Sequence, residues 1–390
     1  MKRTCLAVVA FGLFVVVQIV QADWTPLKRL TWNLGGSEYP ALAVDSNSTL
    51  HVVCRDGTPG NLEIFYMKSP DGGLTWSIPK RITWTSKRSN TPAIAIDSQG
   101  TIHVVWQDDA PEDVTGIYYK RSTDGGTTWS TMKRLTWSWT TGGWSYNPVI
   151  AVDSSNIVHV VWNDDASGQY ELYYKRSSDG GLSWSSLKRI TWGYGHHAGA
   201  SIIIGLSNAI HAVWHGDVFG SSGEIFYKKS TDQGATWTLN KRLTWNSGWS
   251  SEPAIAVDLS GQLHVVWDDD TPGNFDIYHA KSTDGGDNWT AAKRVNWNPG
   301  NSILPAIGTD SFGFLHVVWQ DNETGTDEIL YKKSPDGGVS WAPVAQGLTY
   351  ENSGDSYRPA IGVDYLGNLH VVWSDSTPGN REIYYRKYVR

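Results

Sequence analysis

The sequence predicts an all-β fold, a seven-bladed β-propeller of four-stranded antiparallel blades. One observation is an internal repeat that returns every 52 to 56 residues. A second is that each repeat consists of short strand-like segments separated by turn residues. A third is that the last repeat lacks its fourth strand, whereas a segment of that type stands alone near the N-terminus.

The repeat is clearest in an apolar motif of the type His-Val-Val-Trp. Its seven copies begin at His51, His103, His159, His211, His264, His316 and His370. In six of the repeats an aspartate stands six residues before the histidine: Asp45, Asp97, Asp153, Asp258, Asp310 and Asp364. An Asp–His pair can activate a nucleophile. Six equivalent copies instead predict a hydrogen bond that closes each hairpin.

Each repeat contains four predicted strands, A to D. Strand A resembles PAIAVD, strand B LHVVW and strand C EIYYKRS, and strand D ends in KRLTW. β-Branched and aromatic residues fill these segments, Gly, Asp, Asn and Pro bound them, and no helical period appears. A β-solenoid also repeats, but its coils are shorter and usually lack such hairpins.

The two ends of the chain predict how the ring closes. The last repeat supplies strands A, B and C between Pro359 and Tyr388, and a lone strand D occupies Trp24–Trp32. We expect the N-terminal strand to complete the seventh blade, because that pairing leaves no exposed sheet edge. The strand could equally enter the last blade of a neighbouring molecule, which would give swapped oligomers or extracellular fibres.

Residues 1–22 have the pattern of a secretory signal peptide. A basic start precedes the apolar run Cys5–Val17, and small residues lead to Ala22. The apolar run is shorter than the roughly 20 residues of a membrane-spanning helix. We therefore expect a secreted protein, extracellular or periplasmic, whose residues 23–390 form the propeller. A retained membrane anchor is the alternative.

Composition narrows the function. The formal net charge is −7, with 39 acidic and 32 basic residues, which argues against nucleic-acid binding. Only Cys54 lies outside the predicted signal peptide, so no internal disulfide is expected. Stability must then come from packing, to which the 22 tryptophans contribute.

A second motif, Ser-x-Asp-x-Gly-x-x-Trp, lies between strands C and D. Its six copies begin at Ser69, Ser122, Ser177, Ser230, Ser282 and Ser334. Asp oxygens accept turn N–H groups and Gly permits positive φ, so we expect a structural turn. The motif closely resembles the Asp-box, or BNR repeat, of sialidases and other secreted propellers. The resemblance implies a propeller whose Asp-boxes lie away from the ligand face.

The sialidase-like family further implies an arginine trio for a substrate carboxylate, a Tyr–Glu nucleophile pair and an Asp acid/base. This chain has seven repeats where that family has six, and it lacks the Arg-Ile-Pro-like motif. No Tyr–Glu pair can be assigned, although Glu38, Tyr39 and Tyr357 fall on the same predicted face. The resemblance thus implies the fold, and the departures put the catalysis in doubt.

Residues that depart from the repeat mark a candidate ligand face, formed by the B–C and D–A loops. Three tryptophans there suit stacking on sugar rings, or else they cover neighbouring loops: Trp139, Trp144 and Trp249. Four arginines gather in loops near the closure: Arg55, Arg88, Arg358 and Arg381. Arginine grips carboxylate bidentately, but solvated loop charge explains such residues as well.

The fourth repeat carries a possible metal site. His196, His197, His215 and Asp217 map to the ligand face, and imidazole with carboxylate can hold a transition metal. No closely spaced ligand motif supports this site. No other cofactor is expected.

These observations lead to three functional hypotheses. The first is a secreted, non-catalytic propeller that binds a glycan or another surface ligand. The second is a sialidase-like glycoside hydrolase acting on a carboxylate-bearing sugar. The third is a structural protein that assembles by strand exchange.

Overall fold

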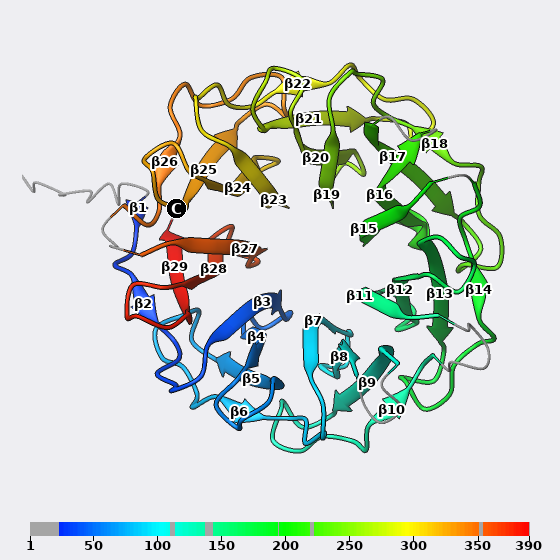
Figure 1. Ribbon diagram of the computed structural model, residues 1–390, viewed down its shortest axis with the longest axis vertical. Helices are drawn as coiled ribbons and strands as arrows, with labels where there is room; N and C mark the ends of the chain where they lie inside the picture. Colours follow the sequence, from blue (N-terminus) through cyan, green and yellow to red (C-terminus); the bar gives the residue numbers. More distant parts are fainter. Residues whose placement is uncertain are drawn as a thin grey trace, which may run out of the picture.

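Seven four-stranded antiparallel sheets surround a central axis in the computed structural model (Figure 1). The predicted fold class is therefore confirmed. Blade 1 contains β3 to β6, the next blades follow in chain order, and blade 7 combines β27 to β29 with β1 and β2. The structure describes residues 23–109, 114–136, 143–193, 195–218, 222–350 and 354–389.

Each blade runs outward from the axis. The innermost strands are β3 (Ser37–Val44), β7 (Ser89–Ile96), β11 (Ser145–Val152), β15 (His197–Ile204), β19 (Ser250–Val257), β23 (Ser302–Thr309) and β27 (Ser356–Val363). The second strands are β4 (Leu50–Asp56), β8 (Ile102–Asp108), β12 (Val158–Asp164), β16 (Ile210–Val218), β20 (Leu263–Asp269), β24 (Leu315–Asp321) and β28 (Leu369–Asp375).

The outer half of each blade is less regular. The third strands are β5 (Glu63–Ser69), β9 (Gly116–Ser122), β13 (Glu171–Ser177), β17 (Ser222–Ser230), β21 (Asp276–Ser282), β25 (Glu328–Ser334) and β29 (Glu382–Val389). The outermost strands are β6 (Lys80–Arg81), β10 (Lys133–Arg134), β14 (Lys188–Arg189), β18 (Lys241–Arg242), β22 (Lys293–Arg294) and β26 (Gln346–Gly347). One 3₁₀ turn, η1 (Leu206–Asn208), precedes β16.

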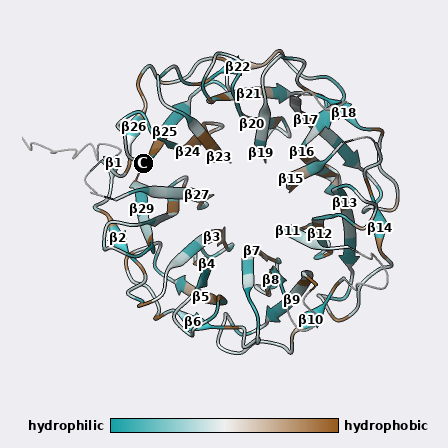
Figure 2. Cartoon of the chain, viewed as in Figure 1, coloured by the Kyte–Doolittle hydropathy of each residue, from teal (hydrophilic) through white to brown (hydrophobic). Residues whose placement is uncertain are grey.

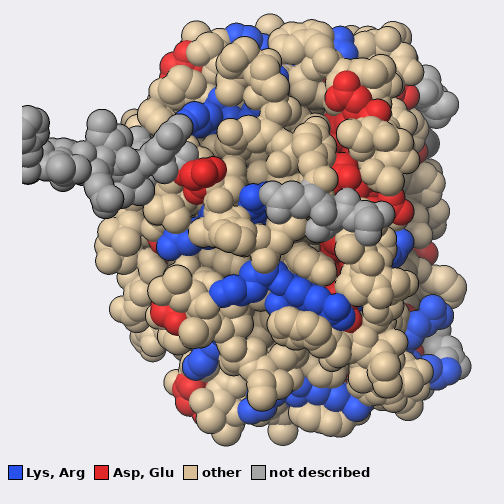
Figure 3. Space-filling view, turned by 90° about the vertical axis from the view of Figure 1, so that its left-hand side faces the viewer, with Lys and Arg blue, Asp and Glu red and all other residues tan. Residues whose placement is uncertain are grey.

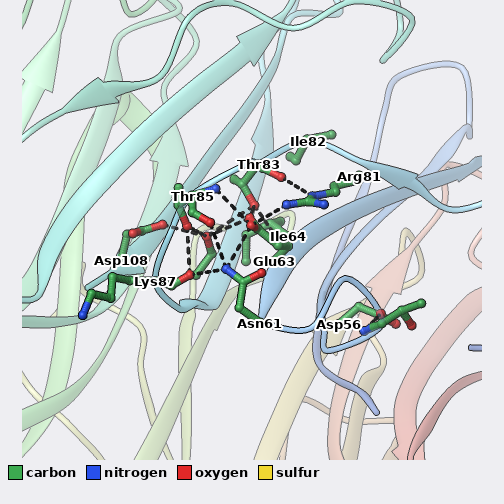
Figure 4. Close-up of polar contacts among 12 residues, drawn as sticks. Asp56, Asn61, Glu63, Ile64, Arg81, Ile82, Thr83, Thr85, Lys87 and Asp108 are labelled. Atoms are coloured by element: carbon green, nitrogen blue, oxygen red, sulfur yellow. Dashed lines mark hydrogen bonds and ion pairs between the residues drawn. The ribbon is translucent and has the colours of Figure 1, made fainter. Parts of the chain in front are cut away.

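The outermost strand is shorter than predicted, because a side chain interrupts its ladder. Ile82 still donates its N–H to the carbonyl of Ile64, but the Ile64 N–H bonds to the Thr83 hydroxyl instead of the backbone. The buried Glu63 carboxylate then accepts bonds from Thr83, from Arg81 at 2.6 Å and from the N–H of Thr85 at 3.0 Å (Figure 4). The strand therefore ends where this polar network begins.

The core lies between neighbouring blades. The fully buried tryptophans are those of the second strands: Trp106, Trp162, Trp214, Trp267, Trp319 and Trp373. Figure 2 shows apolar stretches on inner strands such as β15 and β23, whereas outer strands such as β6 and β18 are hydrophilic. Burial of these large aromatic side chains is a major favourable contribution to folding.

The Ser-x-Asp-x-Gly-x-x-Trp motif, which resembles an Asp-box, forms a turn that contacts the preceding blade. In the second copy, Asp124 accepts hydrogen bonds from Ser122 and from the N–H of Thr128, both at 2.8 Å. Trp129 then packs edge-on against Tyr66 of the preceding blade, with ring centroids 5.2 Å apart. Gly126 is required there, since a Cβ at this position would lie 2.2 Å from the Tyr66 ring.

The predicted Asp–His hydrogen bond is present and extends to a tyrosine. His103 Nε2 lies 3.3 Å from Asp97, and its Nδ1 lies 2.7 Å from the Tyr119 hydroxyl. Burial lowers the pKa of His103, so the ring is neutral at pH 7. The same relay recurs in blades 1, 3 and 7 and belongs to the framework. Blade 4 has Gly205 in place of the aspartate, and blade 5 has His279 in place of the tyrosine.

The N-terminal strand closes the ring within the same chain. β1 (Asp23–Trp24) and β2 (Lys28–Arg29) both pair with β29, as the blue and red ribbons of Figure 1 show. The Trp24 ring packs 5.1 Å from that of Tyr331 and 5.3 Å from that of Tyr388. None of the described segments forms a helix able to cross a membrane.

Candidate functional site

A strained residue marks the axial end of every innermost strand. The first strand of each blade shifts register at this point, for example between Glu38 and Ala41. The residue within the shift has a positive φ: Tyr39, Thr91, Asn147, Gly199, Glu252, Leu304 and Arg358. Positive φ is costly for non-glycine residues and concentrates at functional sites.

These seven residues differ in every blade, although the strand around them repeats. Together with the prolines that follow most of them, they line a cavity of about 430 Å³ at the axial mouth. The strand position facing the bulge varies as well: Arg55, Gln107, Asn163, His215, Asp268, Gln320 and Ser374. A regular framework thus places seven different types of residue around one opening.

Three of the four predicted arginines meet where blade 7 joins blade 1. The guanidinium carbons of Arg55 and Arg358 each lie 4.2 Å from the Tyr39 ring centroid. The guanidinium carbon of Arg381 lies 4.4 Å from the Tyr357 ring centroid. Cations at this distance are attracted to the faces of aromatic rings, so these side chains hold one another in place.

Glu38 organises this cluster. It forms ion pairs with Arg55 and, at 2.7 Å, with Arg381. Burial would raise the pKa of Glu38, but hydrogen bonds from the two arginines outweigh it and lower the pKa below its ordinary value. Arg358 is exposed and forms no ion pair with any residue that the structure describes. Its guanidinium is therefore available to a ligand.

The cluster surrounds a hollow of about 330 Å³, which we call the arginine pocket. Its walls are Glu38, Tyr39, Arg55, Ile303, Leu304, Gln320, Tyr357, Arg358, Ser374 and Arg381. The sequence analysis assigned these arginines to loops, which is wrong for two of them: Arg55 lies in β4 and Arg358 in β27. The bulge allows β4 and β27 to continue past the apolar repeat motif. Both arginines therefore project from strands, which gives the site a rigid base.

Arg88 lies apart from the arginine pocket. Its Nε is 3.6 Å from Asp109, and it lines a separate hollow of about 570 Å³ with Trp144 and Tyr146. Trp144 is half-exposed and packs edge-on against Tyr146, 6.3 Å away between centroids. Arg55 links the two hollows through a 2.6 Å hydrogen bond to Asn90.

The other predicted tryptophans have different surroundings. Trp249 covers Gly223, where a Cβ would lie 2.7 Å from the indole ring. Gly223 belongs to β17 (Ser222–Ser230), and the Trp249 ring is 40% exposed. Trp139 lies outside the described residues.

The four residues of the predicted metal site each contact a different neighbour. Trp214 donates its indole N–H to His197 Nδ1 at 3.0 Å, and the His196 ring packs against Tyr170. His215 faces Gly199, and Asp217 accepts a long hydrogen bond from the His196 backbone. Across the described ranges, no three His, Cys, Asp or Glu side chains are grouped so that they could hold a metal ion.

An acidic group lies on another side of the axial mouth. Asp268 is almost fully buried and accepts hydrogen bonds from Ser251 and from the backbone N–H of Leu304, the latter at 2.9 Å. Burial raises its pKa to about 7. Burial also lowers the pKa of His215, the facing residue of the preceding blade. Burial therefore favours the neutral form of each side chain, which is the protonated carboxyl of Asp268 and the unprotonated imidazole of His215.

The sequence analysis missed the seven bulge residues as a set. The available signal was the position just before the proline that opens strand A, which differs in each repeat while its surroundings do not. Comparison of the repeats at that single position would have found it.

Comparison with known proteins supports the fold. No protein-family model matches the chain, and the search of curated proteins finds no relative. Among solved structures, a Hadza microbial sialidase is 16% identical, with a TM-score of 0.56 over 88% of this chain and 74% of that one. An ulvan lyase bound to a GlcA-containing saccharide is 11% identical, with a TM-score of 0.65 over 91% and 94%.

A third similar structure is an α-L-arabinofuranosidase from Fusarium graminearum. It is 17% identical, with a TM-score of 0.53 over 76% of this chain and 92% of that one. At these identities the likeness extends to the fold, so function must be argued from the site itself. The chain thus shares the propeller architecture of a sialidase, a polysaccharide lyase and an arabinofuranosidase.

Proposed function

We propose that the protein binds a carboxylate-bearing sugar, such as a uronic or sialic acid, in the arginine pocket. The observation that carries this proposal is the convergence of Arg55, Arg358 and Arg381 around Tyr39 and Tyr357. A guanidinium presents two parallel N–H donors that match a carboxylate, which makes arginine the preferred group for this recognition.

The three arginines have different roles in this proposal. Arg55 and Arg381 are fixed by Glu38, so they shape the pocket and add positive potential. Arg358 is exposed and receives the carboxylate. The rings of Tyr39 and Tyr357 hold the three guanidinium groups in place. Three cations and one carboxylate leave the pocket with net positive charge.

A glycan is the favoured ligand class for two reasons. The pocket combines aromatic rings with polar side chains, including Gln320 and Ser374, as sugar recognition requires. Similar solved propellers include a sialidase, an ulvan lyase and an arabinofuranosidase, proteins named for activity on glycans. A secreted protein would meet such ligands, and secretion remains a prediction from residues 1–22.

Cleavage of the bound sugar is the second candidate function. It is favoured by the position of Tyr39, whose ring contacts Arg55 and Arg358, because a phenolic hydroxyl beside a bound sugar could act as a nucleophile or as a base. Asp268, with a pKa of about 7, is a candidate proton donor behind the pocket wall, where it accepts a hydrogen bond from the N–H of the lining residue Leu304. Binding alone remains the leading function, since Glu38 is occupied by two ion pairs.

Calorimetric titration of the mature protein tests the binding proposal. We expect glucuronate and N-acetylneuraminate to bind, and glucose, which lacks the carboxylate, to bind at least about ten-fold more weakly. Equal affinity for the neutral sugar would contradict recognition by the arginines. Release of reducing sugar or of an unsaturated product from acidic oligosaccharides would establish the second candidate. Strand-exchange assembly has no support among the described residues, since β1 and β2 pair within the chain.

A further inference from the structure

The tryptophans that follow the outermost strands are exposed, although the sequence gives them the regularity of core residues. They are between 61% and 72% exposed: Trp32, Trp84, Trp192, Trp245 and Trp297. Tyr350 holds the same position in the sixth blade and is also exposed. A large apolar side chain exposed once proves little, but the same exposure at one position in six of the seven blades marks an interaction surface.

Each ring is held in place by an arginine of its own blade. A lysine nitrogen also lies 5.4 to 5.8 Å from the ring centroids of Trp84, Trp192 and Trp297. The guanidinium carbon of Arg242 lies 5.7 Å from the Trp245 centroid, and the equivalent pairs elsewhere are 5.6 to 6.0 Å apart. Arg242 is itself fixed by an ion pair with the buried Glu224 and a hydrogen bond to the Thr244 carbonyl. The ring is therefore oriented before any ligand arrives, which lowers the entropic cost of binding.

A groove of about 610 Å³ adjoins one of these rings at the outer wall. It lies between β18 and the Asp-box of the next blade, and is lined by Trp245, Asn246, Asp287, Asn288 and Trp289, among others. Lys241 spans the seam by donating to the Asp287 carbonyl. Lys80 makes the same contact with Thr127 at another seam, so the arrangement repeats around the ring.

Charge on the outer wall favours an anionic ligand. Lys and Arg side chains form bands across the wall in Figure 3, while Asp and Glu gather mainly toward one edge. The bands follow from the sequence, because the outer strands β2, β6, β10, β14, β18 and β22 each consist of Lys and Arg, and only β26 among the described outer strands of this type does not. The net charge of −7 does not prevent this, since local potential decides binding.

We propose that this tryptophan belt binds an acidic polysaccharide, with sugar rings stacked on the exposed indoles and carboxylates or sulfates near the lysine and arginine bands. Each contact is weak, and several on one chain gain avidity. The belt lies on the outer wall, apart from the arginine pocket, and the inference does not depend on the proposed function. It adds a second, multivalent surface that selects polymers over single sugars.

Affinity electrophoresis in gels containing polygalacturonate tests the belt, with neutral dextran as the comparison polymer. The triple variant Trp84→Ala/Trp192→Ala/Trp245→Ala is expected to lose at least about ten-fold in polygalacturonate affinity, and each single variant less. The control is Leu239→Ala/Leu259→Ala, which removes exposed apolar side chains outside the belt and should leave retention unchanged.

Two further arms make the result decisive. Arg358→Ala should retain polygalacturonate binding while losing glucuronate binding, so failure of the arginine pocket and failure of the belt are distinguishable. Wild-type retention in the triple variant, equal retention by dextran, or absence of polygalacturonate binding by the wild type would each overturn the proposal. The melting temperature of the triple variant reports whether it folds. If it does not fold, the three single variants test the proposal.

Discussion

The guanidinium carbon of Arg358 lies 4.2 Å from the ring centroid of Tyr39, although the two residues are 358 − 39 = 319 positions apart in the chain. Closure of the ring brings them together, because blade 7 packs beside blade 1. We therefore expect the arginine pocket to depend on closure of the ring, which the pairing of β1 and β2 with β29 completes. Folding and recognition are coupled at this seam.

Removal of residues 23–32 is expected to abolish the pocket together with the stability of the ring. The deletion would expose the edge of β29 and uncover Tyr331 and Tyr388, and an unpaired edge is prone to aggregation. Size-exclusion chromatography and thermal melting of the truncated protein measure this. Trp24→Ala is the milder companion, expected to cost about 3–5 kcal/mol at most. A monomeric truncation with an unchanged melting temperature would be inconsistent with closure by this strand.

Tyr39→Phe separates binding from cleavage. The substitution keeps the ring that Arg55 and Arg358 contact and removes only the hydroxyl. Sugar affinity should change by less than about three-fold, whereas any turnover of acidic oligosaccharides should fall by two orders of magnitude or more. Parallel calorimetry and product analysis provide both values. Turnover that survives in Tyr39→Phe would exclude the tyrosine as the reactive group.

Asp268 predicts a pH dependence of stability. Its folded pKa of about 7 lies above the ordinary value of 3.8, so between these values the folded state binds more protons than the unfolded state. Stability is therefore expected to fall as pH rises through this window. Asp268→Asn removes the titration while an amide can still bond to Ser251 and Leu304.

Melting temperatures at about pH 5 and pH 8 test this sign. The substitution should raise the melting temperature relative to wild type more at the higher pH. Ser374→Ala, at the equivalent position of blade 7, is the control and should shift equally at both. The prediction would be contradicted if the melting temperature of the wild type rose between these two pH values and that of Asp268→Asn rose by the same amount. Asp268 would then be ionised at both.

Two glycines distinguish packing from backbone strain. Gly100 and Gly126 both have positive φ, at 79° and 86°. A Cβ at Gly100 meets nothing within 4 Å, whereas one at Gly126 would lie 2.2 Å from the Tyr66 ring. Gly126→Ala should therefore cost about 1–3 kcal/mol more than Gly100→Ala in chemical denaturation. Equal losses would show that the Asp-box glycine serves only the turn.

The fold was predictable because its determinants are local and repeated. Seven copies of one apolar strand, six Asp-boxes and a missing last strand define the architecture, and Trp24 pairs where that reasoning places it. The meeting of Arg55 with Arg358 also follows from closure. The side-chain arrangement within the pocket does not, since it depends on the cation–π contacts and ion pairs of a specific bulge.

Two features resisted prediction for physical reasons. The positive φ of Tyr39 or Leu304 is imposed by pairing with the second strand against the local preference of the residue, and local sequence does not report it. The exposure of Trp245 is the second such feature, because the repeat alone does not distinguish an exposed ring from a buried one. A residue that recurs in every repeat can face either the core or the solvent, so its recurrence does not predict its burial.

Glucuronate affinity in two arginine variants tests the arginine pocket most directly. Arg358→Ala removes the exposed guanidinium over Tyr39, whereas Arg88→Ala removes an exposed arginine that lines the separate hollow beside Trp144. Calorimetry should show a loss of at least about ten-fold for Arg358→Ala and a change of less than about two-fold for Arg88→Ala. Equal affinities in both variants and the wild type would contradict carboxylate recognition at the seam of blades 7 and 1.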